Sequence, residues 1–219
     1  MTDPLRQIYV VDDDAAVARA LARLLRAAGY EPVIFTSARD FMERCKPDAP
    51  GCLVLDVSMP GITGLELQEW LVQAASPLPI IFLTGRGDIP TSVRAMKYGA
   101  VDFLTKPVNE SDLLKAIQEA SRRECTTRAA RAEVQAVQAR LATLTPRERE
   151  VMEHVVSGRL NKQIADRLGT VEKTIKVHRA RVMEKLGVAS LAELVRMAER
   201  VGIGGERVVA IESSERPRA

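Results

Sequence analysis

Short apolar runs that stop at a polar residue are the feature that most limits what this chain can fold into. Residues 53–55 (LVL) form one such run, which is too short for a helix and stops at Asp56. Pro60 and Gly61 break the chain soon afterwards. The pattern is typical of a buried parallel strand that opens onto a loop, the place where open α/β sheets bind ligands. Taken alone, however, Asp56 could simply cap a turn.

Four further apolar runs alternate with helical patterns over the first 121 residues. Strands are expected at 8–11, 32–35, 53–55, 79–83 and 101–104. Helices are expected at about 17–28, 38–44, 65–74, 91–98 and 110–121. Five strands that alternate with helices predict a five-stranded, doubly wound parallel sheet of the α/β class.

Polar side chains end three of these strands and follow another. Asp12 and Asp13 end the first strand, Asp56 the third and Thr84 the fourth, while Lys106 follows the fifth. The carboxyl ends of parallel strands share one edge, so these carboxylates should lie together and repel one another. A divalent, oxygen-seeking cation removes that repulsion, and Mg²⁺ (or Mn²⁺) fits best. A set of helix caps with one Lys–Asp ion pair is the alternative.

Four segments of this region carry a family resemblance. They are VVDDD at 10–14, LVLDVSMPGITG at 53–64, LTGRGD at 83–88 and DFLTKP at 102–107. Together they make residues 5–121 resemble the receiver domain of two-component systems, which implies a flavodoxin-like arrangement of the sheet. The resemblance implies that Asp56 is the phosphoacceptor, and that Asp13, Asp56 and the Ser58 backbone carbonyl ligate Mg²⁺ while Asp12 acts through water. It places Asp14 in a variable position outside the site.

The same resemblance assigns roles to the remaining polar groups. Thr84 and Lys106 should contact the phosphoryl group, through a hydroxyl hydrogen bond and a fixed positive charge. Phe103 should be the aromatic side chain that changes rotamer when Thr84 moves inward. A carboxylate nucleophile beside a divalent cation suits in-line phosphoryl transfer. We therefore expect a phosphoacceptor with at most slow self-phosphorylation from small donors and slow autodephosphorylation, not an enzyme.

Charge is divided unevenly along the chain. The net charge is −4 over residues 1–121 and +4 over residues 143–201. This asymmetry predicts a nucleic-acid partner for the second part only. No apolar stretch approaches the roughly 20 residues of a membrane span, so we expect no membrane partner and a cytoplasmic location. Cys45, Cys52 and Cys125 lack metal-ligand spacing and should be reduced thiols.

Residues 122–142 contain no Gly or Pro and are rich in Ala, Arg and Gln. Val134, Val137 and Leu141 recur at helical spacing, so we expect a helical linker. The apolar stripe is compatible with a short coiled coil between partners or with an ordinary solvated helix.

Helix signals are unusually clear after residue 143. TPRE at 145–148 combines an N-cap, a proline at the first helical position and a capping box. A short second helix should start at Asn161 and stop at Gly169, Thr170 should cap a longer third helix, and SLAE at 190–193 should start a fourth. A short helix, a glycine-containing turn and a longer basic helix predict an all-α helix-turn-helix domain.

The third helix carries the expected DNA contacts. Its basic residues and Val177 suit base edges and thymine methyl groups in the major groove, although a solvated helix with a charged outer face would share this composition. Residues 144–188 resemble the LuxR-type helix-turn-helix, with TVEKTIKVH at 170–178 as the most specific part. The resemblance implies that Lys176 and Val177 face the bases. The other expected DNA contacts are Asn161, Lys162, Lys173, Thr174, His178, Arg179 and Arg181.

The expected order is a receiver domain at 1–121, a helical linker at 122–142, a LuxR-type domain at 143–203 and a flexible tail at 204–219. This order resembles the NarL/FixJ subfamily of response regulators, and residues 83–107 resemble its FixJ side. Arg86 and Tyr98 stand where an imidazole and a small side chain are expected. The resemblance implies that a cognate sensor histidine kinase phosphorylates Asp56, which promotes homodimerisation and binding to double-stranded promoter DNA, with RNA polymerase as a further partner.

Two other functions fit parts of the pattern. A Mg²⁺-dependent aspartyl phosphatase of the haloacid dehalogenase type also uses an aspartyl nucleophile, but it usually has a second acid two residues later, where this chain has Ser58. A transcription regulator that is controlled by a partner protein, without phosphorylation, is the main alternative.

Overall fold

The computed structural model describes residues 6–85 and 89–203 and divides into two compact units, Met1–Ala130 and Arg131–Ala219. The division falls inside the segment expected to link two domains. Arg86 and the tail expected at 204–219 lie outside the described residues. Within the described ranges, none of the helices combines the length and the apolar character needed to span a bilayer.

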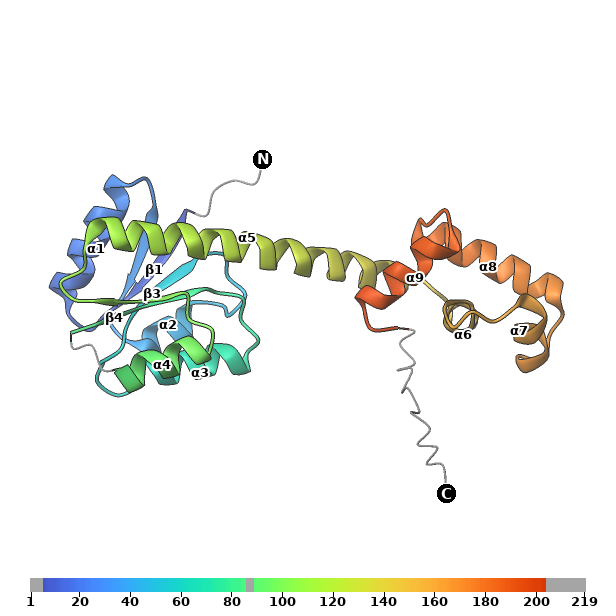
Figure 1. Cartoon of the computed structure of the whole chain (residues 1–219), viewed down its shortest axis with the longest axis horizontal. Coiled ribbons are helices and arrows are strands. Elements are labelled where there is room, and N and C mark those ends of the chain that lie inside the picture. The colour runs from blue at the N-terminus through green and yellow to red at the C-terminus, as the bar shows by residue number, and fades with distance from the viewer. Residues whose placement is uncertain (1–5, 86–88, 204–219) are drawn as a thin grey trace, which may run out of the picture. The chain divides into compact units, whose positions relative to one another are not determined.

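The first unit is a parallel sheet with helices on both faces (Figure 1), in the strand order β2-β1-β3-β4-β5. Its strands are β1 (Gln7–Val11), β2 (Glu31–Phe35), β3 (Cys52–Asp56), β4 (Ile80–Thr84) and β5 (Asp102–Thr105). Its helices are α1 (Ala15–Ala27), α2 (Ala38–Arg44), α3 (Gly64–Gln73), α4 (Ile89–Lys97) and the first part of α5 (Glu110–Leu141). The predicted doubly wound α/β fold is confirmed.

Two apolar clusters hold the helices on opposite faces of this sheet. One joins the sheet to α1 and α5 through residues such as Leu25 and Ile117. The other joins it to α2, α3 and α4 through Phe41, Leu67 and Ala95. All residues of β3 and β4 are buried, which explains why these strands read as continuous apolar runs. Because every strand is parallel to its neighbours, all the carboxyl ends lie at one edge.

Helix α5 extends much further than expected. The sequence predicted a helix to about Ser121 and then a linker, but Glu110–Leu141 is one helix of 32 residues with no Gly or Pro to stop it. Val137 and Leu141 neither form a coiled coil here nor lie in solvent, since both are buried in the core of the second unit. The helix end expected near Ser121 is therefore wrong, because nothing in the sequence stops the helix there. The packing of Val137 and Leu141 could not be predicted either, since apolar periodicity does not reveal which unit a helix face packs against.

The second unit contains α6 (Pro146–Val156), α7 (Asn161–Arg167), α8 (Glu172–Leu186) and α9 (Leu191–Arg200). The expected capping box of α6 is present, with Glu148 N donating to Thr145 Oγ1 and Thr145 N donating to the Glu148 carboxylate. Thr170 is not the cap of α8, and that prediction is wrong. The N-cap is Val171, whose apolar side chain accepts no hydrogen bond, so α8 starts without a side-chain cap.

Candidate functional site

Three carboxylates converge at the carboxyl edge of the sheet. Strands β1 and β3 pair in parallel with Val11 opposite Leu55, which places Asp12 and Asp56 side by side. Asp12 is fully buried, Asp56 is 5% exposed and Asp13 is exposed. One carboxylate oxygen from each of the three lies within 4.8 Å of the others. The structure therefore brings together the three acidic residues that the sequence singled out.

Lys106 joins the two buried carboxylates. Its Nζ lies 2.7 Å from Asp12 Oδ2 and 3.2 Å from Asp56 Oδ1. Burial raises the pKa of Asp56 and the charge of Asp12 adds to this rise, whereas Lys106 and the Ser58 backbone N–H oppose it. Burial alone would lower the pKa of Lys106, but its hydrogen bonds and ion pairs with the two carboxylates raise that pKa overall. Lys106 is thus a stable positive charge beside Asp56.

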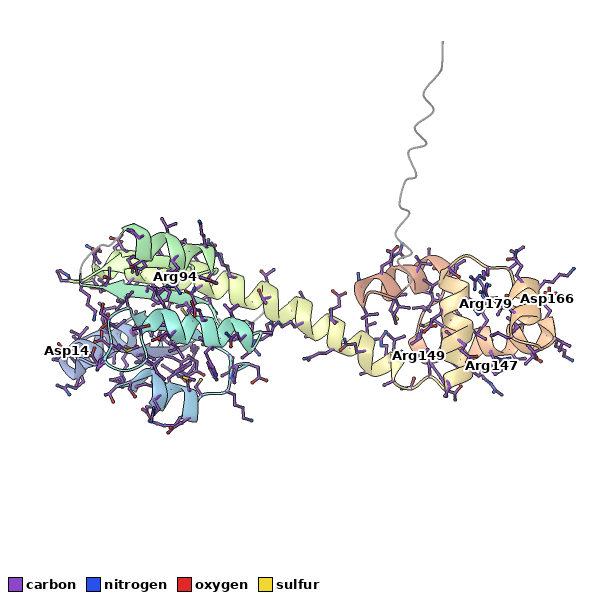
Figure 2. The ribbon with its side chains drawn as sticks, turned by 90° about the horizontal axis from the view of Figure 1, so that it is seen from below. Asp14, Arg94, Arg147, Arg149, Asp166 and Arg179 are labelled. Atoms are coloured by element: carbon purple, nitrogen blue, oxygen red, sulfur yellow. The ribbon has the colours of Figure 1, made fainter. Side chains whose placement is uncertain are left out.

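Helix capping does not account for the acidic cluster. Asp14, which the sequence left outside the site, caps α1 by accepting hydrogen bonds from Ala16 N and Val17 N (Figure 2). Asp12 uses one oxygen for Asp14 N and the other for Lys106. One ammonium group does not neutralise three carboxylates, and the donor atoms are all oxygens. This donor set suits a hard divalent cation such as Mg²⁺.

Thr84 and Phe103 lie on the neighbouring strands. Thr84 is the last residue of β4, is 4% exposed, and accepts a hydrogen bond from Lys106 N at its carbonyl oxygen. Phe103 is half-buried on β5, where its ring centroid lies 6.0 Å from that of Phe82 in the apolar cluster under α2, α3 and α4. Thr84 thus lies at the carboxyl edge of the sheet with the acidic residues. Phe103 lies two residues before the end of β5.

Gly64 is a site residue that the sequence analysis missed. A Cβ at this position would lie only 2.3 Å from the Asp56 backbone oxygen and 3.1 Å from Val57 Cα. Gly64 N also donates to Val57 O, so the start of α3 packs directly against the end of β3. The sequence carried no signal for this role, because it depends on the strand end that lies opposite Gly64.

Helix α8 presents the second group of expected site residues. Ile175, Val182 and Leu186 are buried, as predicted, and anchor the helix. Lys176 and Val177 are exposed, and Lys176 Nζ forms an ion pair with Glu172 Oε1 at 3.1 Å. Among the other expected contacts on this helix, the exposed residues are Lys173 and Arg181, and the half-buried ones are Thr174, His178 and Arg179.

Helices α7 and α8 are connected at their outer surface. Arg179 Nη1 on α8, labelled in Figure 2, donates to Asn161 Oδ1 on α7 at 3.3 Å. Lys162 is exposed beside this contact. Leu160 and Val171 are 69% and 64% exposed at the starts of these two helices. Sequence patterns did not identify these two apolar residues, because isolated exposed side chains carry no periodicity.

A doubly wound sheet with acids and a lysine at its carboxyl edge, joined in one chain to a helix-turn-helix unit, defines a response regulator. Residues 8–118 match the family of response regulator receiver domains, and residues 142–198 match the luxR family of bacterial regulatory proteins. The chain belongs to the NarL/FixJ type of response regulators and is a two-component transcription factor. Receiver domains generally bind Mg²⁺ at such an acidic pocket, and the family implies a sensor kinase and DNA as partners.

Full-length relatives support this assignment. Nodulation protein W of Bradyrhizobium diazoefficiens is 46% identical over 90% of this chain and 86% of its own length. The transcriptional regulatory protein FixJ of the same organism is 44% identical over 90% of this chain and 96% of its own. Among solved structures, the response regulator StyR has a TM-score of 0.78 at 46% identity, covering 89% of this chain and 98% of its own. Full-length FixJ from B. japonicum has a TM-score of 0.55 at 44% identity, covering 92% and 98%.

Proposed function

We propose that phosphorylation of Asp56 by a cognate sensor histidine kinase promotes receiver dimerisation and sequence-specific binding to promoter DNA. The placement of Asp56 is the observation that carries this proposal. Its carboxylate lies at the carboxyl edge of the sheet, within 3.2 Å of Lys106 Nζ and beside two further acids. A nucleophile with a cation next to it, at a strand end that opens onto loops, suits phosphoryl transfer.

The transfer step uses the groups at this edge. One carboxylate oxygen of Asp56 attacks the phosphorus of the kinase phosphohistidine; an O–P bond forms as the N–P bond breaks, and the electron pair stays on the imidazole nitrogen. Lys106 pairs with the new phosphoryl oxygens, and the Thr84 hydroxyl donates a hydrogen bond to one of them. A divalent cation, Mg²⁺ or Mn²⁺, held by Asp13, Asp56 and the Ser58 carbonyl, with Asp12 through water, would supply further charge neutralisation when bound.

The switch then runs from Thr84 to the α4–β5–α5 side of the receiver. Phosphorylation adds roughly −1.5 to −2 charge, by analogy with other phosphoresidues, and draws Thr84 inward so that Phe103 changes rotamer. Residues 89–121 rearrange and pair two receivers. Helix α4 supports this assignment, because Val93, Met96 and the nearby Tyr98 are 47%, 46% and 47% exposed. Exposed apolar groups that gather on one short helix are suited to a protein partner.

Pairing of receivers places two recognition helices on one operator. We assign base contacts to Lys176 and Val177 on α8, whose exposure supports this role. The phosphate contacts and supports are assigned to Asn161, Lys162, Lys173, Thr174, His178, Arg179 and Arg181. Linking two such domains raises operator affinity through effective concentration, and half-sites should lie about one helical turn or a multiple apart. RNA polymerase would be the partner of the complex bound to DNA.

One experiment tests the phosphorylation switch. Wild type, Asp56→Asn and Asp14→Asn are compared with and without acetyl phosphate and Mg²⁺, and light scattering gives the oligomeric state. Binding is measured on a duplex selected from a random pool. Wild type and Asp14→Asn, which keeps a capping side chain, should dimerise and bind DNA roughly 100-fold more tightly with the phosphodonor. Asp56→Asn should do neither.

The opposite result would support the main alternative. Equal DNA binding by all three proteins in every condition would mean that phosphorylation does not gate the receiver, and control by a protein partner would replace this proposal. Continuous turnover of a phosphomonoester would instead favour an aspartyl phosphatase.

A further inference from the structure

A buried glutamine joins α3 to α4. Gln68 is 1% exposed, and its Nε2 donates a hydrogen bond of 3.0 Å to the backbone oxygen of Ala95, in the last turn of α4. Its Oε1 is buried and has no hydrogen-bond partner within the described residues. The orientation of the amide is fixed, because only the NH₂ group can face a carbonyl oxygen. The amide nitrogen of Gln68 therefore has a hydrogen-bond partner, whereas its amide oxygen has none among the described residues.

Helix α4 buries little of its described side-chain surface. Among its described side chains, residues 90–97, Ala95 alone is buried. Arg94, labelled in Figure 2, forms an ion pair with Glu69 of α3 at 2.5 Å, but the two side chains are 54% and 34% exposed, so water weakens the pair. The hydrogen bond from Gln68 to Ala95 O is therefore a buried contact between α3 and the one described α4 residue whose side chain is buried.

The unpaired oxygen makes this resting position less stable than it would otherwise be. A buried carbonyl group without a donor loses its hydration and gains nothing in return. When α4 moves away, Gln68 loses one hydrogen bond, but its Oε1 becomes accessible to water. The two effects oppose each other, so the free energy needed to break this contact is smaller than that of a hydrogen bond in which both groups of the amide are satisfied.

We propose that Gln68 is the positioning residue that holds α4 in its unphosphorylated position, and that the break of the Gln68–Ala95 hydrogen bond is a step in activation. This inference rests on the proposed phosphorylation switch and specifies how one element of it is restrained. Gln68 does not touch the phosphoacceptor and acts through the position of α4.

The test compares Gln68→Met with Gln73→Met in the full-length protein. Methionine is similar in length to glutamine but forms no comparable hydrogen bond, and Gln73 is exposed at the end of the same helix. Two quantities are measured: amide hydrogen exchange in α4 without a phosphodonor, and the acetyl phosphate concentration that gives half-maximal dimerisation. The amides in the last turn of α4 are the probes, because local opening of this helix should become easier when its contact with α3 is lost.

Gln68→Met should raise amide exchange in α4 about two- to threefold and lower the required acetyl phosphate concentration by a similar factor, because the loss of the hydrogen bond is partly offset by removal of the unpaired oxygen. Exchange in α3 and all properties of Gln73→Met should match wild type. Equal values for Gln68→Met and wild type, or a higher phosphodonor requirement for Gln68→Met, would overturn the inference.

Wild type provides a second test that does not depend on how the variant folds. Acetyl phosphate with Mg²⁺ should raise exchange of the amides in the last turn of α4 in wild type, and unchanged exchange would also overturn the inference. If wild type binds the phosphoryl group but neither dimerises nor gains DNA affinity, the proposed function fails. If wild type responds fully while Gln68→Met matches it, only the role of Gln68 fails.

Discussion

Single residues in this protein often serve two purposes, and Glu148 is a clear example. Its carboxylate accepts a hydrogen bond from Thr145 N, which closes the capping box of α6, and also pairs with Lys185 Nζ on α8 at 2.6 Å. The hydrogen bond from Lys185, followed by that from Thr145 N, lowers the pKa of Glu148 to about 2. One side chain therefore fixes the start of α6 and ties it to the helix expected to read DNA.

This ion pair predicts an acid-sensitive second unit. The folded pKa of Glu148 lies below the unfolded value, so its contribution to stability is present above pH 4.5 and is lost as the pH falls toward about 2. Lys185→Met should lower the melting temperature of the second unit at neutral pH and flatten its decline between these pH values. Scanning calorimetry over this range measures both effects. Lys176→Met, which removes an exposed pair, is the control and should keep the wild-type pH profile.

Residues that carry charged groups at strand ends could be predicted from the sequence. Residues that matter because of the neighbours they pack against could not. Asp12, Asp56 and Lys106 carry charged groups where apolar runs stop, so their types and positions reveal them. Gly64 and Gln68 matter because of what lies opposite them: a backbone oxygen at one and the end of α4 at the other. Neither neighbour can be identified without the packing of β3, α3 and α4.

Among the elements, α5 has the most unexpected packing. Glu124 lies beyond the predicted end of the receiver but is only 5% exposed, and Arg128 Nε reaches its Oε1 at 2.5 Å. Arg128 Nη2 also lies 3.5 Å from the backbone oxygen of Asp48, between α2 and β3. The segment of α5 around residues 124–128 is therefore attached to the loop that precedes β3, at the opposite end of this strand from Asp56.

Removal of this attachment should loosen the middle of α5. Arg128→Ala leaves Glu124 buried without its cation, so the free energy of unfolding of the first unit should fall by about 2 kcal/mol. Amide exchange should also rise across residues 122–130. Arg122→Ala, which breaks an exposed pair with Glu119, is the matched control and should cost less than about 0.5 kcal/mol. Identical denaturation curves for the two variants would show that the buried pair contributes nothing.

Element ends were harder to predict than element types. No Gly or Pro interrupts residues 110–141, so composition predicted helix throughout but gave no place where the receiver ends. At α8 the polar Thr170 looked like the cap, although Val171 occupies that position. Burial of Val171 is not the reason, since its side chain is 64% exposed. Thr170 instead belongs to the end of α7, since its N–H donates to Ala165 O.

At the scale of the whole molecule, the boundary of the second unit differs from what motifs suggest. The family resemblance begins near residue 143, but the apolar core of this unit also includes Val137 and Leu141 of α5, at 6% and 4% exposure. Arg140 Nη1 further donates to Leu186 O at the end of α8. The last turns of α5 are thus a structural part of the helix-turn-helix unit.

Two fragments test this boundary. A fragment of residues 131–203 retains the complete core and should unfold cooperatively. A fragment of residues 143–203 lacks two buried apolar side chains, worth about 4 kcal/mol together, a large fraction of the stability of a small domain. Thermal unfolding followed by circular dichroism should show a much lower melting temperature for the shorter fragment, or no transition. Equal transitions would mean that α5 merely rests on a self-sufficient domain.

The fold class was predictable because its signal repeats along the sequence. Each of the five strands contains a short apolar run, and each such run is followed by a helical pattern. The division into units was less predictable, because one helix crosses it without any change in composition.

The contact at Gly64 has a consequence for how such a sequence can change. No unusual backbone angle demands glycine there; the Asp56 carbonyl oxygen excludes every other side chain. Codons 56 and 64 are therefore coupled, although only codon 56 encodes the proposed phosphoacceptor. Any larger residue at position 64 would displace the end of β3 that carries Asp56, so few substitutions should be accepted at codon 64.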